Sequence, residues 1–389
     1  MTEQTGSKVP QIRLKGFDRA WEDKPIGEVL AEKKRPVVLK DHQRYELITV
    51  KRRNEGVVLR GHLFGRDILV KNYSQLQAGD FVISKRQVVH GATGIIPPKL
   101  DGAIVSNEYL VAVDSNSLLT GFLTILASLP DMRQKFFLSS YGVDIEKLFF
   151  DAEDWKKRNV IIPGITEQTQ ICEYFKGLDC LIGLHQRKHD KLVTLKKAMH
   201  QKMFPQAGAS TPEIRFKGFT RVWVEQKLGE LCDEFHSGKF ISASEITETG
   251  EYPVHGGNGL RGFTARFNHD GLYAVIGRQG ALCGNMNLFS GKAFFTEHAI
   301  AVQANKDNDT VFLYYLFGQM NLGQYSSQSA QPGLAVNKLQ ELRSYICTKS
   351  EQIQIGSYFR TLDALISKHA IQLQKLKQIK SACLEKMFV

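Results

Sequence analysis

A loose nuclease-like pattern supplies the first side chains that could do chemistry. Pro130-Asp131 is followed by Asp154-Trp155-Lys156, and two carboxylates with a lysine can hold a metal ion for phosphodiester cleavage. A spacing this permissive arises often by chance, and it occurs in only one half of the chain. We therefore keep Asp131, Asp154 and Lys156 as an alternative hypothesis and favour a chain with no catalytic residues.

Other side chains have the types that read nucleic acids. Arg and Gln can pair with guanine and adenine edges, and Lys and Arg bind phosphates. Residues 31–100 hold 14 basic side chains against 6 acidic ones, and the second half of the chain places arginines among glycines. The residues that we predict to contact DNA are Lys51, Arg52, Arg53, Lys85, Arg86, Gln87, Arg261, Arg266, Arg278 and Gln279.

Each of these arginines has a structural or solvated role as its alternative. Arg86 and Arg278 recur at matching positions of two otherwise different regions. That recurrence fits a shared DNA contact, but it equally fits a salt bridge to Glu108 and Glu297. Both interpretations stay open at the level of the sequence.

Two globular regions must position these side chains. Residues 79–87 align with 271–279, and residues 108–113 align with 297–302. These short apolar runs, bounded by Gly and Asn, predict strands. Residues 118–129 and 310–320 predict short amphipathic helices. Each region is therefore expected to be a small α+β unit built around a twisted sheet.

The chain is an internal duplication. Residues 10–30 (PQIRLKGFDRAWEDKPIGEVL) and 212–232 (PEIRFKGFTRVWVEQKLGELC) are identical at ten of 21 positions. Residues 167–204 and 351–388 agree at 18 of 38 positions without a gap, and both end in Lys-Met-Phe. We call the first pair the 21-residue blocks. The block at 212–232 directly follows the first long segment. By analogy, the second long segment should end near the block at 10–30, close to the N-terminus.

The two long repeated segments predict helices with a heptad-like apolar seam. Such a stripe needs a partner helix, and the second copy in antiparallel orientation is the obvious one. His185 and His369 also fall on the seam, where a hydrogen-bonded pair is favoured over a metal site. The predicted seam residues are Ile171, Phe175, Leu178, Ile182, Leu192, Met199, Ile355, Phe359, Leu362, Ile366, Leu376 and Met387.

The predicted fold class is α+β. Two small mixed α/β recognition domains are separated by two long antiparallel coiled-coil helices in a pseudo-two-fold arrangement. The expected boundaries are 1–165 for the first domain and 166–206 for the central helix. The second domain is expected at 207–350 and the C-terminal helix at 351–389.

Composition limits the classes of function. A net charge of +11 over 389 residues favours an anionic partner. Six cysteines without a C-x-x-C pair argue against structural zinc and suit a reducing compartment. The sequence shows no signal peptide and no apolar run of 18 residues, so we expect a cytoplasmic protein without membrane contact. It also contains no P-loop, no dinucleotide-binding fingerprint and no Asn/Asp-Pro-Pro-Tyr/Phe methyltransferase string.

Three motifs together resemble the specificity subunits of type I restriction–modification systems. They are the P-x-I-R-[LF]-K-G-F start of both blocks, the repeated E-Q-x-Q-I…K-M-F helix and the run at 277–334. That run reads G-R-Q-G-A…F-x-T-E-H-A-I…Y-S-S-Q-S-A-Q-P-G-L. The resemblance extends over essentially the whole chain and includes the tandem order, although the first globular region is the less typical one.

The resemblance implies two target recognition domains that each read one half of a bipartite double-stranded DNA site. The helices would set the gap and dock two methyltransferase subunits, and motor–nuclease restriction subunits would join them. S-adenosylmethionine, ATP and Mg²⁺ are expected in those partner subunits, with no cofactor or metal in this chain. The alternative from another class is a coiled-coil adaptor whose domains bind proteins without DNA specificity.

Overall fold

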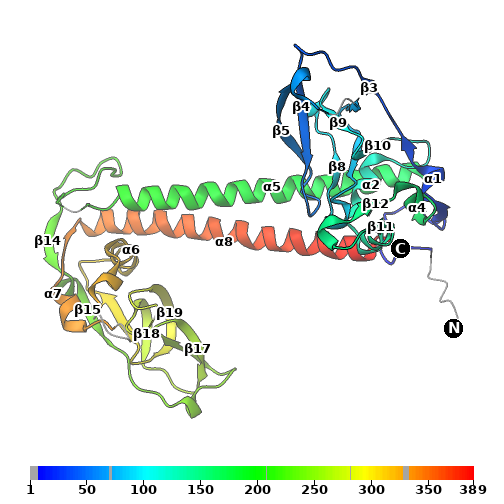
Figure 1. The fold of residues 1–389 in the computed structure, drawn as a ribbon. Coiled ribbons are helices and arrows are strands. Elements are labelled where there is room, and N and C mark those ends of the chain that lie inside the picture. Colours follow the sequence, from blue (N-terminus) through cyan, green and yellow to red (C-terminus); the bar gives the residue numbers. More distant parts are fainter. Residues whose placement is uncertain (1–7, 70–71, 207, 281, 327–332) are drawn as a thin grey trace. The chain divides into compact units, whose positions relative to one another are not determined.

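The computed structural model describes residues 8–69, 72–206, 208–280, 282–326 and 333–389 (Figure 1). The chain divides into two compact units, one formed by Met1–Leu184 with Leu373–Val389 and one by His185–Gln372. Each unit contains one mixed α/β region and portions of both long helices. The predicted combination of two α+β domains with two long helices is confirmed.

The first unit is built from many short strands. They form a five-stranded sheet in the order β3-β6-β9-β4-β5, a four-stranded sheet in the order β2-β10-β7-β8, and the pairs β1-β13 and β11-β12. The strands are β1 (Glu22–Pro25), β2 (Ala31–Glu32), β3 (Pro36–Val37), β4 (Arg44–Val50), β5 (Val57–Phe64), β6 (Tyr73–Gln75), β7 (Phe81–Ser84), β8 (Thr93–Ile95), β9 (Ile104–Ser106), β10 (Tyr109–Val113), β11 (Ser140–Tyr141), β12 (Phe149–Phe150) and β13 (Asn159–Ile162).

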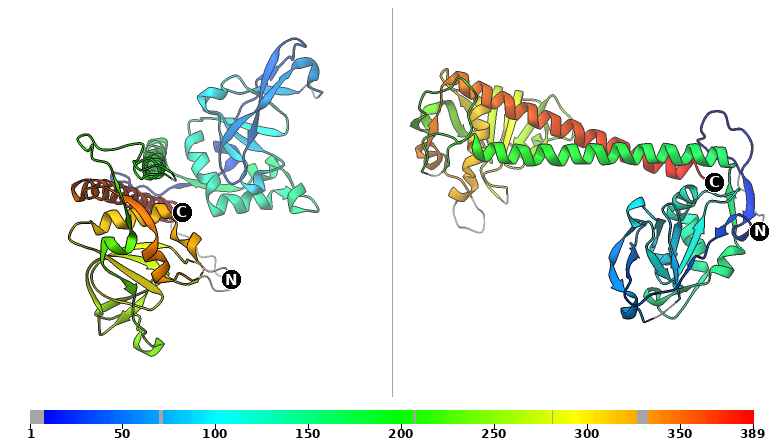
Figure 2. Two further views of the ribbon diagram at one scale, coloured as in Figure 1. Left: turned by 90° about the vertical axis from the view of Figure 1, so that its left-hand side faces the viewer. Right: turned by 90° about the horizontal axis from the view of Figure 1, so that it is seen from above.

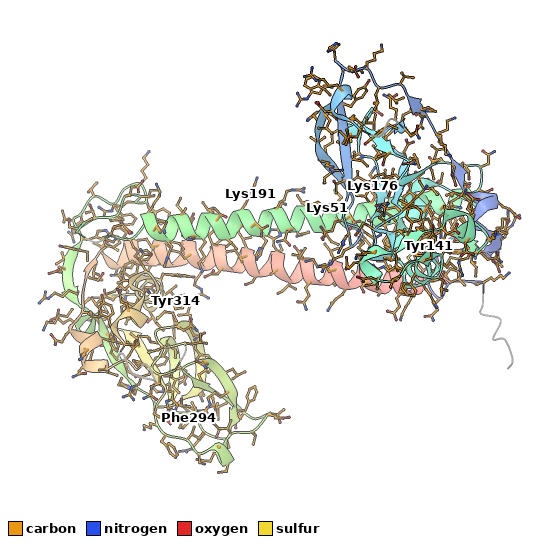
Figure 3. All side chains as sticks on the ribbon, viewed as in Figure 1. Lys51, Tyr141, Lys176, Lys191, Phe294 and Tyr314 are labelled. Atoms are coloured by element: carbon orange, nitrogen blue, oxygen red, sulfur yellow. The ribbon has the colours of Figure 1, made fainter. Side chains whose placement is uncertain are left out.

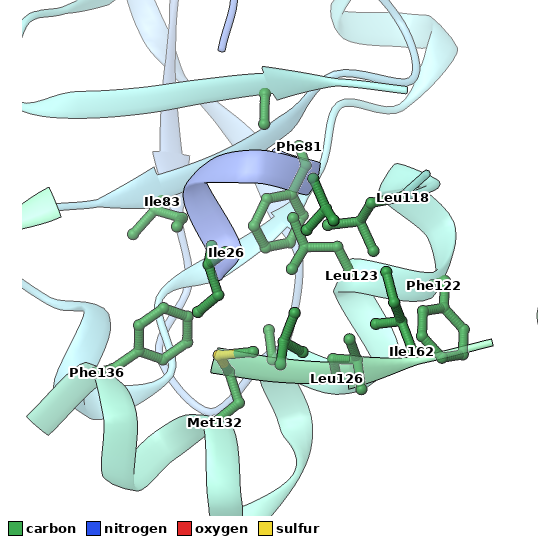
Figure 4. Packing of buried hydrophobic residues seen from close by; sticks show 14 of the residues in the cluster. Ile26, Phe81, Ile83, Leu118, Phe122, Leu123, Leu126, Met132, Phe136 and Ile162 are labelled. Carbon is green, nitrogen blue, oxygen red and sulfur yellow. The ribbon is translucent and has the colours of Figure 1, made fainter. Parts of the chain in front are cut away.

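Four short helices cover the four-stranded sheet and its surroundings: α1 (Ile26–Val29), α2 (Thr120–Ser128), α3 (Pro130–Leu138) and α4 (Ala152–Lys156). Figure 4 shows Phe81 of β7 facing side chains of these helices, among them Leu123 and Phe136. Strand β7 is buried along its whole length because both of its faces carry apolar residues. The predicted strands at 79–87 and 108–113 and the predicted helix at 118–129 are therefore confirmed as β7, β10 and α2.

The second unit contains one large sheet. Its six strands follow the order β15-β20-β18-β19-β16-β17, and β14 pairs with β21 beside it. The elements are β14 (Val224–Lys227), β15 (Cys232–Ser237), β16 (Tyr252–Gly256), β17 (Gly259–Thr264), β18 (His269–Gly277), β19 (Met286–Phe295), β20 (Ala299–Ala304), β21 (Arg343–Ile346), α6 (Thr310–Met320) and α7 (Val336–Glu341).

The two faces of this large sheet bury different side chains. Ala274 and Ile276 of β18 join the core that contains α6, whereas Tyr273 and Val275 of the same strand join a separate aromatic cluster on the other face. This alternation follows from the two-residue period of a strand. The predicted strands at 271–279 and 297–302 and the predicted helix at 310–320 are confirmed as β18, β20 and α6.

The long helices are α5 (Ile165–Lys202) and α8 (Lys349–Lys386), each 38 residues long (Figures 1 and 2). In the first unit, Lys380 Nζ donates a hydrogen bond to Asp179 Oδ1 over 2.6 Å, and the Tyr174 hydroxyl lies 3.4 Å from Cys383 Sγ. Because a later position on α5 contacts an earlier one on α8, the helices are antiparallel.

The second unit shows the same orientation with other residues. His185 Nδ1 lies 2.9 Å from His369 Nδ1, and Lys196 Nζ donates to Asp363 Oδ1 over 2.5 Å. Here too a residue later in α5 contacts a residue earlier in α8, so the two helices run antiparallel. The seam histidines therefore contact each other, as the hydrogen-bonded interpretation expected. Among the described residues, none of the helices combines the length and the apolar character that a membrane span requires.

The twelve predicted seam residues all lie on these helices or directly after α8. Seven are buried: Ile171, Phe175, Leu178, Ile355, Phe359, Leu362 and Met387. Five are partly exposed: Ile182, Leu192, Met199, Ile366 and Leu376. The buried positions lie near the helix ends, where the α/β regions add a second layer of packing.

Each 21-residue block meets the end of a long helix. The Ile12 amide donates to the Lys386 carbonyl over 3.0 Å, and the Ile214 amide donates to the Lys202 carbonyl over 2.9 Å. These bonds satisfy carbonyls that a helix end leaves without an internal partner. The second helix therefore ends beside the N-terminal block, as the duplication predicted.

Candidate nucleic-acid interface

Two basic loops of the first unit lie side by side. Arg52 follows β4 and Gln87 follows β7, and Arg52 Nε donates to Gln87 Oε1 over 2.7 Å. The Arg53 and Asn54 amides donate to the carbonyls of His90 and Gly91 over 2.7 and 2.8 Å. The structure thus brings together the predicted stretches 51–53 and 85–87, although 31 residues separate them in the sequence.

The backbone of the first loop is held in an uncommon conformation. Arg53 and Asn54 have φ angles of 59° and 56°, in the left-handed region. Gly91 approaches them so closely that a β-carbon there would lie 2.8 Å from Asn54 Oδ1. A fixed loop of this kind can present the exposed side chains of Lys51 (Figure 3) and Arg53 at low ordering cost.

Two of the predicted side chains of the first unit, Arg52 and Arg86, have acidic or aromatic neighbours. Arg52 Nη2 donates to Glu146 Oε2 over 2.7 Å, which makes Arg52 a bridge between Gln87 and Glu146. Arg86 Nε donates to Glu108 Oε2 over 2.5 Å, and its guanidinium lies 5.6 Å from the centre of the Phe149 ring. The salt bridge to Glu108 that the sequence left open is therefore present.

Lys85 lies at a pocket that the sequence analysis did not predict. The pocket has a volume of about 380 Å³ and includes Lys33, Lys34 and Lys85 together with Tyr73 and Tyr109. Because β10 lies between β2 and β7, lysines that are about 50 residues apart in the chain line one concave surface. Glu32 and Glu153 also line the pocket, so its three lysines leave an excess of one positive charge.

Three of the four predicted residues of the second unit lie around Gly256 and Gly257. Arg278 Nη1 donates to the carbonyl of Glu297 over 3.2 Å, and Gln279 Oε1 lies 2.8 Å from His298 Nδ1. Arg278 thus contacts the backbone of Glu297, so the predicted alternative of a side-chain salt bridge to Glu297 is wrong for this copy.

The glycines allow three segments to pack closely. A β-carbon on Gly256 would lie 2.7 Å from Arg261 Cδ, and one on Gly257 would lie 2.8 Å from the His298 carbonyl. Larger residues at these two positions would therefore push Arg261 away from the segment that carries Arg278. This local packing explains why the arginines occur among glycines.

Arg266 belongs to a different part of the second unit. Its Nη2 donates to Glu245 Oε1 over 2.7 Å, and its guanidinium lies 5.0 Å from the centre of the Phe294 ring (Figure 3). A hydrogen bond from the Ser242 hydroxyl, followed by the charge of Arg266, lowers the pKa of Glu245. The ion pair therefore persists into mildly acidic solution.

The nuclease-like residues do not form a shared site. Asp131 pairs with Lys135, and Asp154 pairs with Arg158 over 2.9 Å. Lys156 pairs instead with Glu32 and Glu153. Each of the three side chains is thus engaged by a different partner.

Buried thiols offer no reactive nucleophile at neutral pH. Burial raises the pKa of Cys172 to about 11 and that of Cys232 to about 12. Burial also raises the pKa values of Cys283 and Cys347. These thiols therefore stay protonated near neutral pH, where a thiolate would be the reactive form.

Sequence reasoning missed the partners that orient the basic side chains. Glu146, Glu245 and His298 lie 94, 21 and 19 residues from the side chains that they contact. No local pattern links residues at such distances. Part of the run at 277–334 that carries the resemblance, namely residue 281 and residues 327–332, lies outside the described residues.

The comparisons with known proteins agree with the repeated motifs. Residues 221–380 match the family model of the type I restriction modification DNA specificity domain. The Type I restriction enzyme EcoprrI specificity subunit of Escherichia coli is 40% identical over 160 residues, which are 40% of this chain and 39% of that protein. A curated relative from Haemophilus influenzae (strain ATCC 51907 / DSM 11121 / KW20 / Rd) is 24% identical over 150 residues, 37% of this chain and 38% of its own length.

The matched region thus spans about two-fifths of the length of these curated relatives. The crystal structure of the Type-I restriction-modification system S subunit from M. genitalium is similar over 98% of this chain and 99% of that one. Its TM-score is 0.63 at 17% identity, which shows a shared fold. The similarity to the type I restriction modification DNA specificity domain thus covers residues 221–380, and the shared fold covers nearly the whole chain.

Proposed function

We propose that this chain is the DNA sequence-specificity subunit of a type I restriction–modification enzyme, and that each recognition domain reads one half of a bipartite site. The observation that carries the proposal is the duplication. Two α+β regions that differ in sequence are each joined to a long helix by the same contacts, and one of them matches a DNA specificity domain. Two recognition domains that differ in amino-acid sequence, each joined to one of two repeated helices, fit a DNA target with two different halves.

The candidate DNA contacts are those brought together around the loops of each domain. In the first domain they are Lys51, Arg52, Arg53, Lys85, Arg86 and Gln87, and in the second Arg261, Arg266, Arg278 and Gln279. Exposed lysines and arginines would bind phosphates. Arg and Gln side chains held by neighbouring groups would be available for base edges.

The helices are proposed to set the unread gap between the half-sites. A continuous helix of 38 residues is about 57 Å long at 1.5 Å per residue. Helix length would then act as half-site spacing does in dimeric DNA readers.

The catalytic work is assigned to partners. The chain would act as a non-catalytic, cytoplasmic subunit that docks two methyltransferase subunits and is joined by motor–nuclease subunits. S-adenosylmethionine, ATP and Mg²⁺ would be bound by those partners. Burial of the thiols and the separate pairing of Asp131, Asp154 and Lys156 support this division of labour.

Selection of duplexes by the assembled complex tests the proposal. The chain and its methyltransferase subunits are mixed with a randomised double-stranded library, and the bound fraction is sequenced. We expect two short motifs at a constant separation. The affinity for the selected duplex should fall linearly in log K against log salt. A complex that assembles but enriches no motif and binds duplex without salt dependence would favour the protein-adaptor function instead.

A matched pair of variants makes the salt measurement sharper. The double change Lys51→Gln with Arg53→Gln should lower the salt slope by about two, because each phosphate contact contributes about 0.9. The control is Lys227→Gln with Arg343→Gln, which removes one partly exposed and one exposed cation from the β14–β21 pair, where no candidate DNA contact lies. The control should leave the slope unchanged.

A further inference from the structure

Three metal-ligating side chains meet on the large sheet of the second unit. Glu234 and His236 lie on β15, and His269 begins β18. One ligand atom from each residue lies within 4.8 Å of the others. His236 Nε2 is 3.3 Å from Glu234 Oε2, and His269 Nε2 is 3.8 Å from the same oxygen. None of these residues belongs to the candidate DNA interface.

The sheet explains how the three side chains meet. Glu234 and His236 are two residues apart and therefore point to the same face of β15. Strand β20 lies between β15 and β18, and its Ala301 is opposite His236. His269 pairs with Ala293 of β19, and the chain that follows β15 comes to the same place, because the Lys239 amide donates to the Phe295 carbonyl over 2.9 Å. The His269 ring rests on Phe295, with ring centres 4.6 Å apart.

The neighbours of His269 determine its tautomer. Asn268 Nδ2 donates to the Phe295 carbonyl over 2.9 Å, and Asn268 Oδ1 accepts from the Phe295 amide over 2.8 Å. This pair of bonds fixes which end of the Asn268 amide is the oxygen. His269 Nδ1 lies 2.6 Å from that oxygen and must donate to it. The neutral ring therefore presents an unprotonated Nε2 to Glu234.

His236 is held in the same way. Its Nδ1 lies 3.1 Å from the carbonyl of Ser237, which can only accept a hydrogen bond. Its Nε2 is therefore also an acceptor in the neutral ring. The hydroxyl of Tyr273 donates to Glu234 Oε1 over 3.3 Å and leaves Oε2 facing the two imidazoles.

Three acceptor atoms thus converge with no donor between them in the neutral form. Either a proton on one imidazole or a metal cation at the centre would satisfy such a group. A zinc ion with ligand bonds of about 2.0 to 2.1 Å places neighbouring ligand atoms of a tetrahedron about 3.3 Å apart, close to the distance between His236 Nε2 and Glu234 Oε2. Hydrogen bonds from the outer nitrogens of ligating histidines to a carbonyl or amide oxygen are the usual support of a zinc site.

We propose that Glu234, His236 and His269 bind a divalent transition-metal ion of the zinc class and thereby tie β15 to β18. His269 is buried, Glu234 is partly exposed and His236 is exposed, so the fourth coordination position faces solvent. The ion enters from that side. Because β15 and β18 are not neighbours in the sheet, the ion adds a link that the hydrogen-bond ladder does not provide.

Zinc titration of the full-length chain tests the site. The protein is first treated with a chelator, and Zn²⁺ is then added in competition with a chromophoric chelator. We expect one equivalent to bind, and binding to be lost in His236→Gln and in His269→Gln. The matched control is His62→Gln, because His62 also faces a carboxylate, Glu46, over 3.2 Å but has no second histidine there. That control should still bind one equivalent.

Two further readouts separate this site from other causes of zinc binding. Co²⁺ in place of Zn²⁺ should give a spectrum without a thiolate-to-metal charge-transfer band, because no cysteine is a ligand. Tyr273→Phe keeps the ring and removes only the hydroxyl that holds Glu234, and it should weaken binding about 10- to 100-fold. Absence of stoichiometric binding, or full binding by His236→Gln, would overturn the proposal and assign the cluster to proton-mediated ion pairing.

Discussion

Arg13 donates two parallel hydrogen bonds to Glu167, from Nε to Oε1 and from Nη2 to Oε2, both 2.7 Å long. The duplicated copy repeats the geometry between Arg215 and Glu351 at 2.8 and 2.7 Å. In each copy the arginine comes from a 21-residue block and the glutamate from the first turn of a long helix. These hydrogen bonds raise the pKa values of both arginines. Arg13 and Arg215 thus attach the two 21-residue blocks to the long helices.

Breaking one of these pairs should destabilise the second unit. Glu351 is 1% exposed and its partner Arg215 is 16% exposed, so Arg215→Met leaves a buried carboxylate without compensation. We expect a loss of about 3 to 5 kcal/mol in the free energy of unfolding, measured by urea denaturation. The double variant Arg215→Met with Glu351→Met should recover most of it. The control Arg343→Met, from an exposed pair with Glu225, should cost less than about 1 kcal/mol.

Substitutions in the two domains should act on separate half-sites. Arg86→Ala should relax the first half-site only, and Arg278→Ala should relax the second half-site only. A bidentate base contact accounts for about 1 to 3 kcal/mol of discrimination, or roughly 5- to 150-fold. The measurement is duplex selection by each assembled variant. A change in both half-sites from one substitution would mean that the arginine acts through folding.

His200 makes the second unit sensitive to acid. Its Nε2 donates to the Tyr315 carbonyl over 2.9 Å, and the ring packs against Phe204 and Phe359. Burial lowers the pKa of His200 below its ordinary value of 6.5. The folded protein thus binds fewer protons than the unfolded chain, and stability present above pH 6.5 is lost as the pH falls below it.

The variant His200→Gln keeps a donor and removes the titration. It should flatten this part of the stability profile below about pH 6.5, as followed by urea midpoints. Other buried histidines, such as His255, have pKa values shifted in the same direction, so a residual slope is expected. A profile identical to that of the unaltered chain would show that His200 does not contribute.

Lengthening the helix pair should change only the gap between half-sites. One heptad is inserted into α5 between His185 and Lys196, and one into α8 between Asp363 and His369, which keeps the paired residues opposed. Seven residues add about 10 Å, or about three base pairs at 3.4 Å each. Duplex selection should recover the same half-sites at the larger separation, whereas altered half-sites would contradict the spacer role.

The duplication made a large part of the fold predictable. Repeated heptad spacing indicated both helices, and short apolar runs indicated β7 and β18, because a long periodic segment and a fully buried strand both leave a local pattern. Two-residue strands such as β2 and β3 leave none. Their pairing depends on partners far along the chain, such as β10 for β2.

The sequence indicated which basic residues form the candidate interface, but it did not indicate which side chains they contact. The loops at 51–53 and 85–87 were identified by charge, but the contact of Arg52 with Glu146 depends on the folded chain. The same holds for Glu234, His236 and His269, because the 32 residues between the two histidines form no recognised ligand spacing. Only the order of strands in the sheet brings these atoms together.

Methylome sequencing tests the central claim most directly. A cell that lacks other methyltransferases expresses this chain together with its cognate methyltransferase subunit, and every methylated adenine is mapped. The account predicts one asymmetric motif of two short parts with a constant gap, which disappears when the chain is omitted. An assembled complex that leaves no methylated motif, or a motif in one continuous part, would contradict it.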